Sequence, residues 1–187
     1  MKCDVILAGV GGQGVLSVAA IIAQAAVSEG LQVRQSEVHG MAQRGGAVLA
    51  HLRISDAAIP SDLVPRGGAN LILSMEPLES LRYAAWLAPD GALVTAAEPL
   101  VNIPNYPEIS GVLESIETFP LHRIVEAAAL AREAGLARSV NMVMVGAASA
   151  FLPIKAETLE TTIEKMFADK GADANKKAFG LGRIAAK

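Results

Sequence analysis

Hydrophobic and polar positions follow two patterns along the first half of the chain. Short apolar runs bounded by glycine or proline predict buried strands, and longer segments with apolar residues at helical spacing predict helices between them. Strands are expected at residues 2–8, 31–37, 47–54, 69–75 and 92–97, and helices at 14–29 and 77–87. The strand–helix–strand rhythm is typical of an α/β fold.

The second half is mainly helical in pattern. A short strand is expected at 115–119, and helices are expected at 121–133, 139–152, 156–167 and 175–186. We therefore predict one domain over residues 1–187 with a three-layer α/β/α, Rossmann-like architecture and a mostly parallel sheet.

The segment 47–54 differs from the other predicted strands because it alternates. Its polar face carries Leu49, His51 and Arg53, and its other face is apolar throughout. Such a pattern predicts a strand that is half exposed or that faces a partner, and the segment is a candidate for an antiparallel edge of the sheet.

Helices 14–29 and 140–152 are apolar on nearly all sides. In a small three-layer domain an outer helix should have a wide polar face. Either the fold buries these two helices unusually deeply, or another subunit covers them, and the second hypothesis is favoured.

Composition narrows the function classes. The net charge of −3 gives no basic surface for nucleic acid. No apolar run reaches the ~18 residues that a membrane span needs, and a strand follows Met1 directly without a signal region, which predicts a cytoplasmic protein. The single cysteine, Cys3, excludes an internal disulfide, an iron–sulfur cluster or a thiolate zinc site held by this chain alone. Any redox metal is therefore expected in a partner.

The sharpest chemical signal is a glycine turn between the first strand and the first helix, Gly9-Val10-Gly11-Gly12-Gln13-Gly14. Glycines let backbone amides approach an anion closely, and the following helix directs its unpaired N–H groups and positive dipole end to the same point. The turn therefore predicts a diphosphate site with five candidate cofactor-binding residues, Gly9, Gly11, Gly12, Gln13 and Gly14.

Three interpretations of the glycine turn remain open from the residues alone. The spacing matches the dinucleotide fingerprint, and Glu37 lies near the end of the second strand, where an NAD site has an acidic residue. The glycines could also serve only close packing of helix against strand. The third interpretation is a different diphosphate ligand.

The segment after the second predicted strand, 38–46, has no role in a standard dinucleotide-binding unit. It contains His39, Gly40, Arg44, Gly45 and Gly46, of which Arg44 suits a phosphate or a carboxylate. No second histidine or cysteine lies near His39, so we assign no catalytic set and no metal site. The segment is therefore interpreted as a contact surface.

Three segments together carry a family resemblance: the glycine turn with Val15, the run Ser36-Glu37-Val38-His39-Gly40-Met41-Ala42-Gln43-Arg44-Gly45-Gly46, and the run Asn141-Met142-Val143-Met144-Val145-Gly146. They resemble the gamma subunit family of 2-oxoacid:ferredoxin oxidoreductases, and within it the smaller (beta) subunits of indolepyruvate:ferredoxin oxidoreductases. The likeness extends to Ile103-Pro104-Asn105-Tyr106-Pro107 and to Asn175-Lys176-Lys177-Ala178-Phe179.

The resemblance implies a role in oxidative decarboxylation of an aryl 2-oxoacid to an aryl-acetyl-CoA, with electrons passed to ferredoxin. It places thiamine diphosphate and the iron–sulfur clusters in a larger partner subunit, so that this chain holds no reactive cofactor by itself. The glycine turn would then receive coenzyme A (CoA). Glu37, His39, Gly40, Arg44, Gly45 and Gly46 would line the boundary with the larger subunit.

Three alternatives stay open beside this one. The chain could be the gamma subunit of an oxidoreductase for pyruvate, 2-ketoisovalerate or 2-oxoglutarate. It could be a free-standing NAD-binding protein. It could also be a purely structural subunit whose glycine turn binds nothing.

Overall fold

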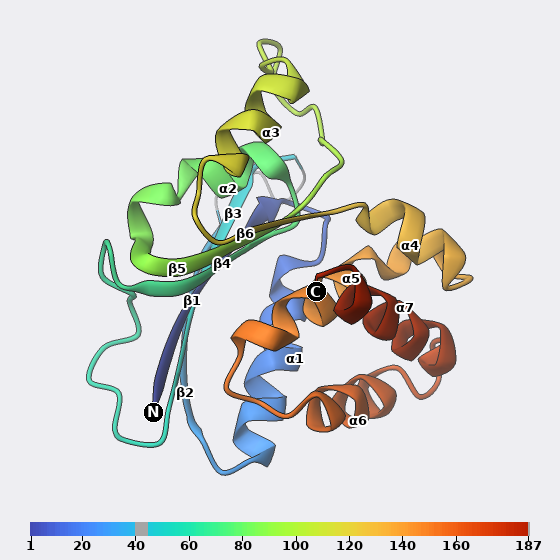
Figure 1. The fold of residues 1–187 in the computed structure, drawn as a ribbon. Coiled ribbons are helices and arrows are strands. Elements are labelled where there is room, and N and C mark those ends of the chain that lie inside the picture. The colour runs from blue at the N-terminus through green and yellow to red at the C-terminus, as the bar shows by residue number, and fades with distance from the viewer. Residues whose placement is uncertain (40–44, 187) are drawn as a thin grey trace.

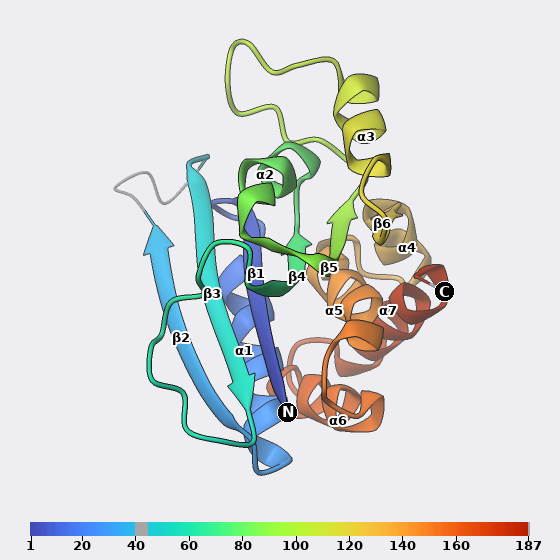
Figure 2. The ribbon, with the colours of Figure 1, turned by 60° about the vertical axis from the view of Figure 1, so that its left-hand side comes forward.

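The structure is a computed structural model that describes residues 1–39, with only the backbone of His39, and 45–186. Six strands in this part of the chain form one sheet in the order β2-β3-β1-β4-β5-β6 (Figures 1 and 2). Their bounds are β1 (Lys2–Val10), β2 (Gln32–His39), β3 (Ala47–Ser55), β4 (Ala69–Ser74), β5 (Leu87–Ala96) and β6 (His122–Val125). Three of the five pairings are parallel, which confirms the predicted mostly parallel sheet.

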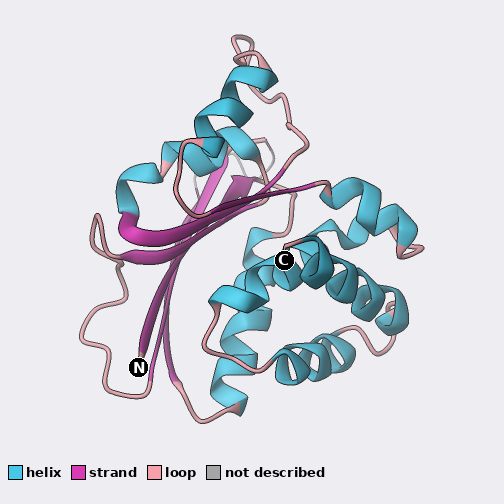
Figure 3. Ribbon diagram, viewed as in Figure 1, coloured by secondary structure: helices cyan, strands magenta, loops and turns pink. Residues whose placement is uncertain are grey.

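Two layers of helices enclose this sheet (Figure 3). One face is covered by α1 (Val15–Ser28), α4 (Ala127–Glu133), α5 (Val140–Ala148), α6 (Ala156–Met166) and α7 (Ala172–Ala185). The other face carries α2 (Pro77–Arg82) and α3 (Ile109–Glu117). Single 3-10 turns lie at Ala84–Trp86, Ala137–Ser139 and Ser149–Phe151. The three-layer α/β/α prediction is confirmed.

Alternation along the central strand divides the core between the two layers. Val5 and Leu7 of β1 face the five-helix layer, whereas Ile6 faces α2 and α3. All three side chains are completely buried. A strand that is apolar on both faces in this way belongs at the centre of a covered sheet.

The strand β3 is antiparallel to both β1 and β2, as the sequence predicted, but it is not the edge of the sheet. The edge position belongs to β2 (Figure 2). Because β2 reaches the sheet by a crossover through α1, the hairpin that follows it returns β3 into the space between β2 and β1.

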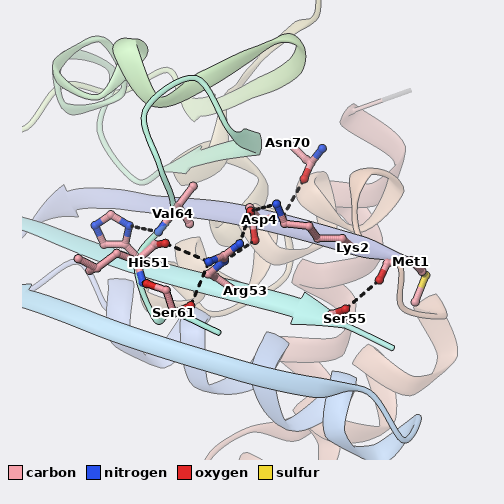
Figure 4. Close-up of polar contacts among 10 residues, drawn as sticks. Met1, Lys2, Asp4, His51, Arg53, Ser55, Ser61, Val64 and Asn70 are labelled. Atoms are coloured by element: carbon pink, nitrogen blue, oxygen red, sulfur yellow. Dashed lines mark hydrogen bonds and ion pairs between the residues drawn. The ribbon is translucent and has the colours of Figure 1, made fainter. Parts of the chain in front are cut away.

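The polar face of β3 is buried, which corrects the expectation that it is exposed or faces a partner. Arg53 Nε and Nη2 donate to the two carboxylate oxygens of Asp4 at 2.8 and 3.1 Å, and Nη1 donates to the backbone oxygens of Ser61 and Leu63 (Figure 4). Lys2 adds a second cation 2.8 Å from Asp4. These bonds fix the connection 56–68 over the strand, because a buried charge needs a partner and satisfied hydrogen bonds.

His51 anchors the same connection to β3. Its Nδ1 accepts a hydrogen bond from the backbone N–H of Val64 at 3.1 Å, and burial lowers the pKa of the imidazole (Figure 4). The neutral ring therefore acts as an acceptor inside the fold.

The helix α5 is covered by its own chain, so the favoured hypothesis of a covering subunit is wrong for it. Residues 142–148 are all buried, mainly against α7. The two helices touch where a Cβ on Gly146 would lie 2.1 Å from the oxygen of Phe179, and where one on Gly182 would lie 1.9 Å from the oxygen of Val143. Small residues let these backbones meet, and α1 is likewise packed against α5 and α6.

Two sequence predictions in the middle of the chain are wrong. Residues 109–117 form α3, where a strand was expected at 115–119, and the expected helix 121–133 is divided into β6 and α4. The strand expected at 92–97 also begins earlier, because β5 starts at Leu87 and includes Pro89-Asp90-Gly91, where the register against β4 shifts between Ala69 and Leu71.

Across the described residues, no helix combines the length and the apolar character that a bilayer crossing requires.

Candidate functional site

The glycine turn lies where the sheet changes the direction of its crossovers. From β1 the chain passes through α1 on one face, and from the neighbouring β4 it passes through α2 on the opposite face (Figure 1). In open α/β sheets, ligands bind in the crevice that such a reversal leaves beyond the carboxyl ends of the strands. The turn therefore occupies the position where this fold class places a ligand.

Gln13 clamps the turn to the end of β4. Its Oε1 accepts a hydrogen bond from the N–H of Val10 at 2.8 Å, and its Nε2 donates to the backbone oxygen of Met75 at 3.0 Å. Both ends of the carboxamide are thus paired within the chain. Gln13 holds the shape of the turn, and its contact with a ligand stays an untested prediction.

The glycines of the turn serve different purposes. A Cβ on Gly9 would lie 2.8 Å from Val15 Cγ2, so Gly9 permits close packing of strand and helix. Gly12 has φ +104° and faces open space. Gly14, with φ +81°, is the N-terminal cap of α1 and lies against Asn141 Nδ2, which is 3.0 Å from where its Cβ would be. Only glycine readily adopts these positive φ angles.

A cavity of about 410 Å³ opens beside the turn. Gly11, Gly12 and Gly14 line it together with an apolar wall and with Ser17 from the first turn of α1; the wall is formed by Val10, Val15, Leu16 and Val48. The volume falls within the roughly 300–1,000 Å³ of small-molecule sites. The first amides of α1 have no acceptor within the helix, so the cavity combines hydrogen-bond donors with an apolar surface.

The last two residues of the 36–46 motif join the turn directly. The N–H of Gly11 donates to the oxygen of Gly46 at 2.8 Å, and the N–H of Gly45 donates to the oxygen of Gly11 at 3.3 Å. The Gly11 amide is therefore already paired and is not a free anion donor. Asn102 also contacts this segment, because its Nδ2 donates to the backbone oxygen of Gly45 at 2.9 Å.

Glu76 is a buried residue of this edge that the sequence analysis did not identify. Its Oε1 accepts the hydroxyl proton of Tyr106 and the N–H of Leu100, and its Oε2 caps α2 through the N–H of Glu79. Burial, together with this hydrogen bond, raises the pKa of Tyr106 far above its usual value. The carboxylate thereby fixes the 99–107 segment, which reaches Gly45 through Asn102.

The remaining predicted boundary residues are placed only in part. Glu37 is exposed on β2 opposite Ala50 of β3, and Gln35 Nε2 donates to its carboxylate at 2.6 Å. His39 pairs with Val48 at the end of β2, as far as its backbone shows. The predictions for Gly40 and Arg44 fall outside the described residues.

Comparison with known proteins identifies the family. The family model described as pyruvate ferredoxin/flavodoxin oxidoreductase matches residues 4–185. Indolepyruvate oxidoreductase subunit IorB of Pyrococcus horikoshii is 37% identical over 98% of this chain and 96% of its own length. The protein of the same name from Archaeoglobus fulgidus is 35% identical over 97% of this chain and 94% of its own length.

The chain belongs to the pyruvate ferredoxin/flavodoxin oxidoreductase family. Solved structures agree with its fold. The gamma subunit of a keto/oxoacid ferredoxin oxidoreductase from Geobacter sulfurreducens aligns with this family member at a TM-score of 0.73 and 24% identity, over 98% of both chains. A 2-oxoglutarate:ferredoxin oxidoreductase from Magnetococcus marinus, solved with 2-oxoglutarate, coenzyme A and succinyl-CoA, aligns at 0.78 and 22% identity. This alignment covers 99% of the present chain and 31% of the Magnetococcus marinus chain, so the fold also occurs as part of a longer chain.

The single cysteine of this family member is not suited to bind a metal. Its single cysteine, Cys3, is buried, and burial raises the pKa of the thiol to about 11. A metal-binding thiolate needs the opposite shift. In the part of the chain that the structure describes, no three histidine, cysteine, aspartate or glutamate residues gather as metal ligands.

Proposed function

We propose that this chain is the smaller subunit of an indolepyruvate:ferredoxin oxidoreductase, and that its glycine turn receives the diphosphate of CoA. As one domain over residues 1–187, located in the cytoplasm, it would support the oxidation of aryl 2-oxoacids to aryl-acetyl-CoA by a larger subunit. The observation that carries the assignment is the near full-length similarity to subunits named IorB, at 33–37% identity.

The geometry of the turn supports a phosphate ligand. Gly12 has no side chain, no described residue lies within 4 Å of its Cβ position, and it lines the cavity beside the first amides of α1. An anion seated there would meet the positive end of the helix dipole, while Val15, Leu16 and Val48 would contact the less polar parts of the ligand. The amide of Gly11 would serve the turn rather than the ligand.

The reactive cofactors are proposed to reside in the larger subunit. Thiamine diphosphate would supply the carbon chemistry there, and iron–sulfur clusters would pass electrons to ferredoxin. The residues of this chain would bind and orient the acyl acceptor. The ends of β2 and β3, with Glu37, Gly45 and Gly46, would form part of the boundary between the subunits.

The position of Glu37 argues against NAD at the same turn. In a dinucleotide-binding fold the second strand lies next to the first, so that its terminal carboxylate reaches the ribose. Here β3 lies between β1 and β2, so the end of β2 is about two strand spacings, roughly 10 Å, from β1 instead of one. A diphosphate ligand without that ribose contact agrees better with this arrangement.

Steady-state kinetics of the chain assembled with its larger subunit would test the proposal. Gly12→Val should raise the KM for CoA by about tenfold or more, because the side chain enters the path of the diphosphate. Gly30→Val is the matched control, since Gly30 also has a positive φ of +79° and open space around it, but lies at the far end of α1. An equal KM for CoA in the two variants would contradict CoA binding at the turn.

The substrate assignment needs a separate measurement. The assembled enzyme should oxidise indolepyruvate with a higher kcat/KM than pyruvate, 2-ketoisovalerate or 2-oxoglutarate. Preference for one of the last three would keep the family role and overturn the aryl specificity. Oxidation of a metabolite by this chain alone with NAD would overturn the whole proposal.

A further inference from the structure

A second cavity, of about 490 Å³, lies at the opposite end of α5 from the glycine turn. Gly146, which lines this cavity, is five residues or about 8 Å along α5 from Asn141, which lies against Gly14 of the turn, and no described residue lines both cavities. Two arginines line this second cavity from different elements, Arg123 from β6 and Arg183 from the last turn of α7. We call it the arginine cleft; its other lining residues are Gly146, Ala147, Ser149, Ala150, Phe151, Ala156 and Ala186.

Arg123 is held in place by backbone oxygens, which leave part of its guanidinium unpaired. Its Nε donates to the oxygen of Ala186 at 2.8 Å, and its Nη1 donates to the oxygen of His122 at 2.7 Å. A guanidinium has five N–H donors, so three remain, including both on Nη2. Among the described residues, no carboxylate forms an ion pair with Arg123.

Arg183 approaches the same cavity from α7. Its guanidinium carbon lies 5.9 Å from the ring centre of Phe179, which positions the planar group by a cation–π contact. In the described part of the chain Arg183 also has no carboxylate partner. Arg53 and Arg82 differ in this respect, because each forms a short ion pair with a carboxylate, Asp4 and Glu79 respectively.

A favourable helix dipole accounts for a cation at the end of α7 but not for two cations around one cavity. Arg132 occupies the last turn of α4 in the same way and lines neither this cavity nor the one at the glycine turn. Among the described residues that line the cleft, none is acidic. The two guanidinium groups therefore offer planar hydrogen-bond donors suited to a carboxylate or a phosphate.

We propose that the arginine cleft binds a small organic oxyanion, with the carboxylate or phosphate group between Arg123 and Arg183. Gly146, Ala147, Ala150 and Phe151 give the cleft an apolar wall, so the ligand carries an apolar body beside its charged group. The site is separate from the glycine turn and does not depend on the function proposed for it.

The test is a titration of the full-length ¹⁵N-labelled chain followed by NMR. The probes are benzoate and phenyl phosphate, which distinguish a carboxylate from a phosphate ligand, and benzyl alcohol, which carries the same ring without the charge. Saturable shifts of the Gly146, Ser149 and Ala150 amides with at least one of the anions are expected, and none with benzyl alcohol.

Arg183→Gln should weaken binding of the anion by about fivefold or more, because one of the two guanidinium groups is lost. Arg132→Gln is the matched control and should leave the affinity unchanged. Arg123→Lys keeps the positive charge but loses the planar guanidinium, so it should also weaken binding. Lysine is chosen because its ammonium group can still donate hydrogen bonds to the backbone oxygens that Arg123 contacts. Gly12→Val should have no effect at this site.

Three outcomes would overturn the proposal. Shifts confined to Gly12, Gly14 and Val15 would place the anion at the glycine turn instead. Equal affinity in Arg183→Gln and the unaltered chain would show that the arginines do not bind it. Equal binding of benzyl alcohol would show an apolar cleft without anion recognition.

Discussion

Glycine has two unlike roles in two regions of this molecule. In the turn after β1, Gly12 and Gly14 have positive φ angles, and Gly12 faces open space. In the contact between α5 and α7, Gly146 and Gly182 are helical, and a Cβ on either would lie within 2.1 Å of a backbone oxygen of the other helix. The turn needs glycine for its backbone angles, whereas the helix pair needs it for the missing side chain.

The difference shows why a glycine in a sequence is ambiguous. A methyl group in the turn strains one residue locally, but a methyl group between the helices must move an entire element. The first change should therefore affect a ligand at the turn more than the fold, and the second should affect the fold more than a ligand at the turn.

The largest effect is expected from Gly182→Ala. The new Cβ would overlap the oxygen of Val143, so α7 must move away from α5, with a loss of unfolding free energy of about 3 kcal/mol or more. Urea denaturation followed by circular dichroism measures the loss. A loss below about 1 kcal/mol would mean that the helix pair adapts easily, and the comparison with the turn would fail.

Gln13→Ala should have the next largest effect. It leaves the N–H of Val10 and the oxygen of Met75 without their partner, which should cost about 1–3 kcal/mol. Gln24→Ala, at an exposed position of α1, is the control and should stay within about 0.5 kcal/mol of the unaltered chain. Equal stability of the two variants would show that Gln13 does not hold the turn.

Gly12→Ala and Gly30→Ala should cost about 1–2 kcal/mol each, because both place a Cβ in the left-handed region without a clash. Thermal unfolding of the two variants side by side measures the strain. Were Gly12→Ala to lose as much stability as Gly182→Ala, the turn would be sterically crowded rather than open.

The smallest effect, and one of opposite sign, is expected from Gly180→Ala. Gly180 lies in α7 two residues before Gly182, but its Cβ position has no neighbour within 4 Å. Alanine should therefore stabilise the chain by about 0.5–1 kcal/mol through helix propensity. Destabilisation in the same urea assay would show that α7 cannot tolerate a methyl group on this side.

The sequence predicted the first half of the fold well because its signals are long and local. The strands 2–8 and 47–54 and the helix 14–29 each agree with the structure to within two residues at either end. The segment 109–125 failed for the opposite reason. Only Val112 and Ile116 of α3 are buried, and β6 has four residues, so neither leaves a clear pattern.

The site was predictable in its local part only. The glycine turn appears as a continuous motif, but Asn102 reaches Gly45 across 57 residues, and Glu76 meets Tyr106 across 30. Such pairs have no spacing that a single sequence reveals. The proline-rich motif around Tyr106 was visible as part of the family resemblance, without any indication of what the tyrosine contacts.

Because α7 covers one side of α5, the packing of α5 cannot be completed during synthesis until α7 has left the ribosome. All six strands leave the exit tunnel before α7 does, and until then the apolar sides of α5 have no cover from it. In a nascent chain that has not yet released α7, the side of α5 that α7 covers therefore stays exposed to solvent. Synthesis of α7, which follows all six strands, is the step that makes this cover available.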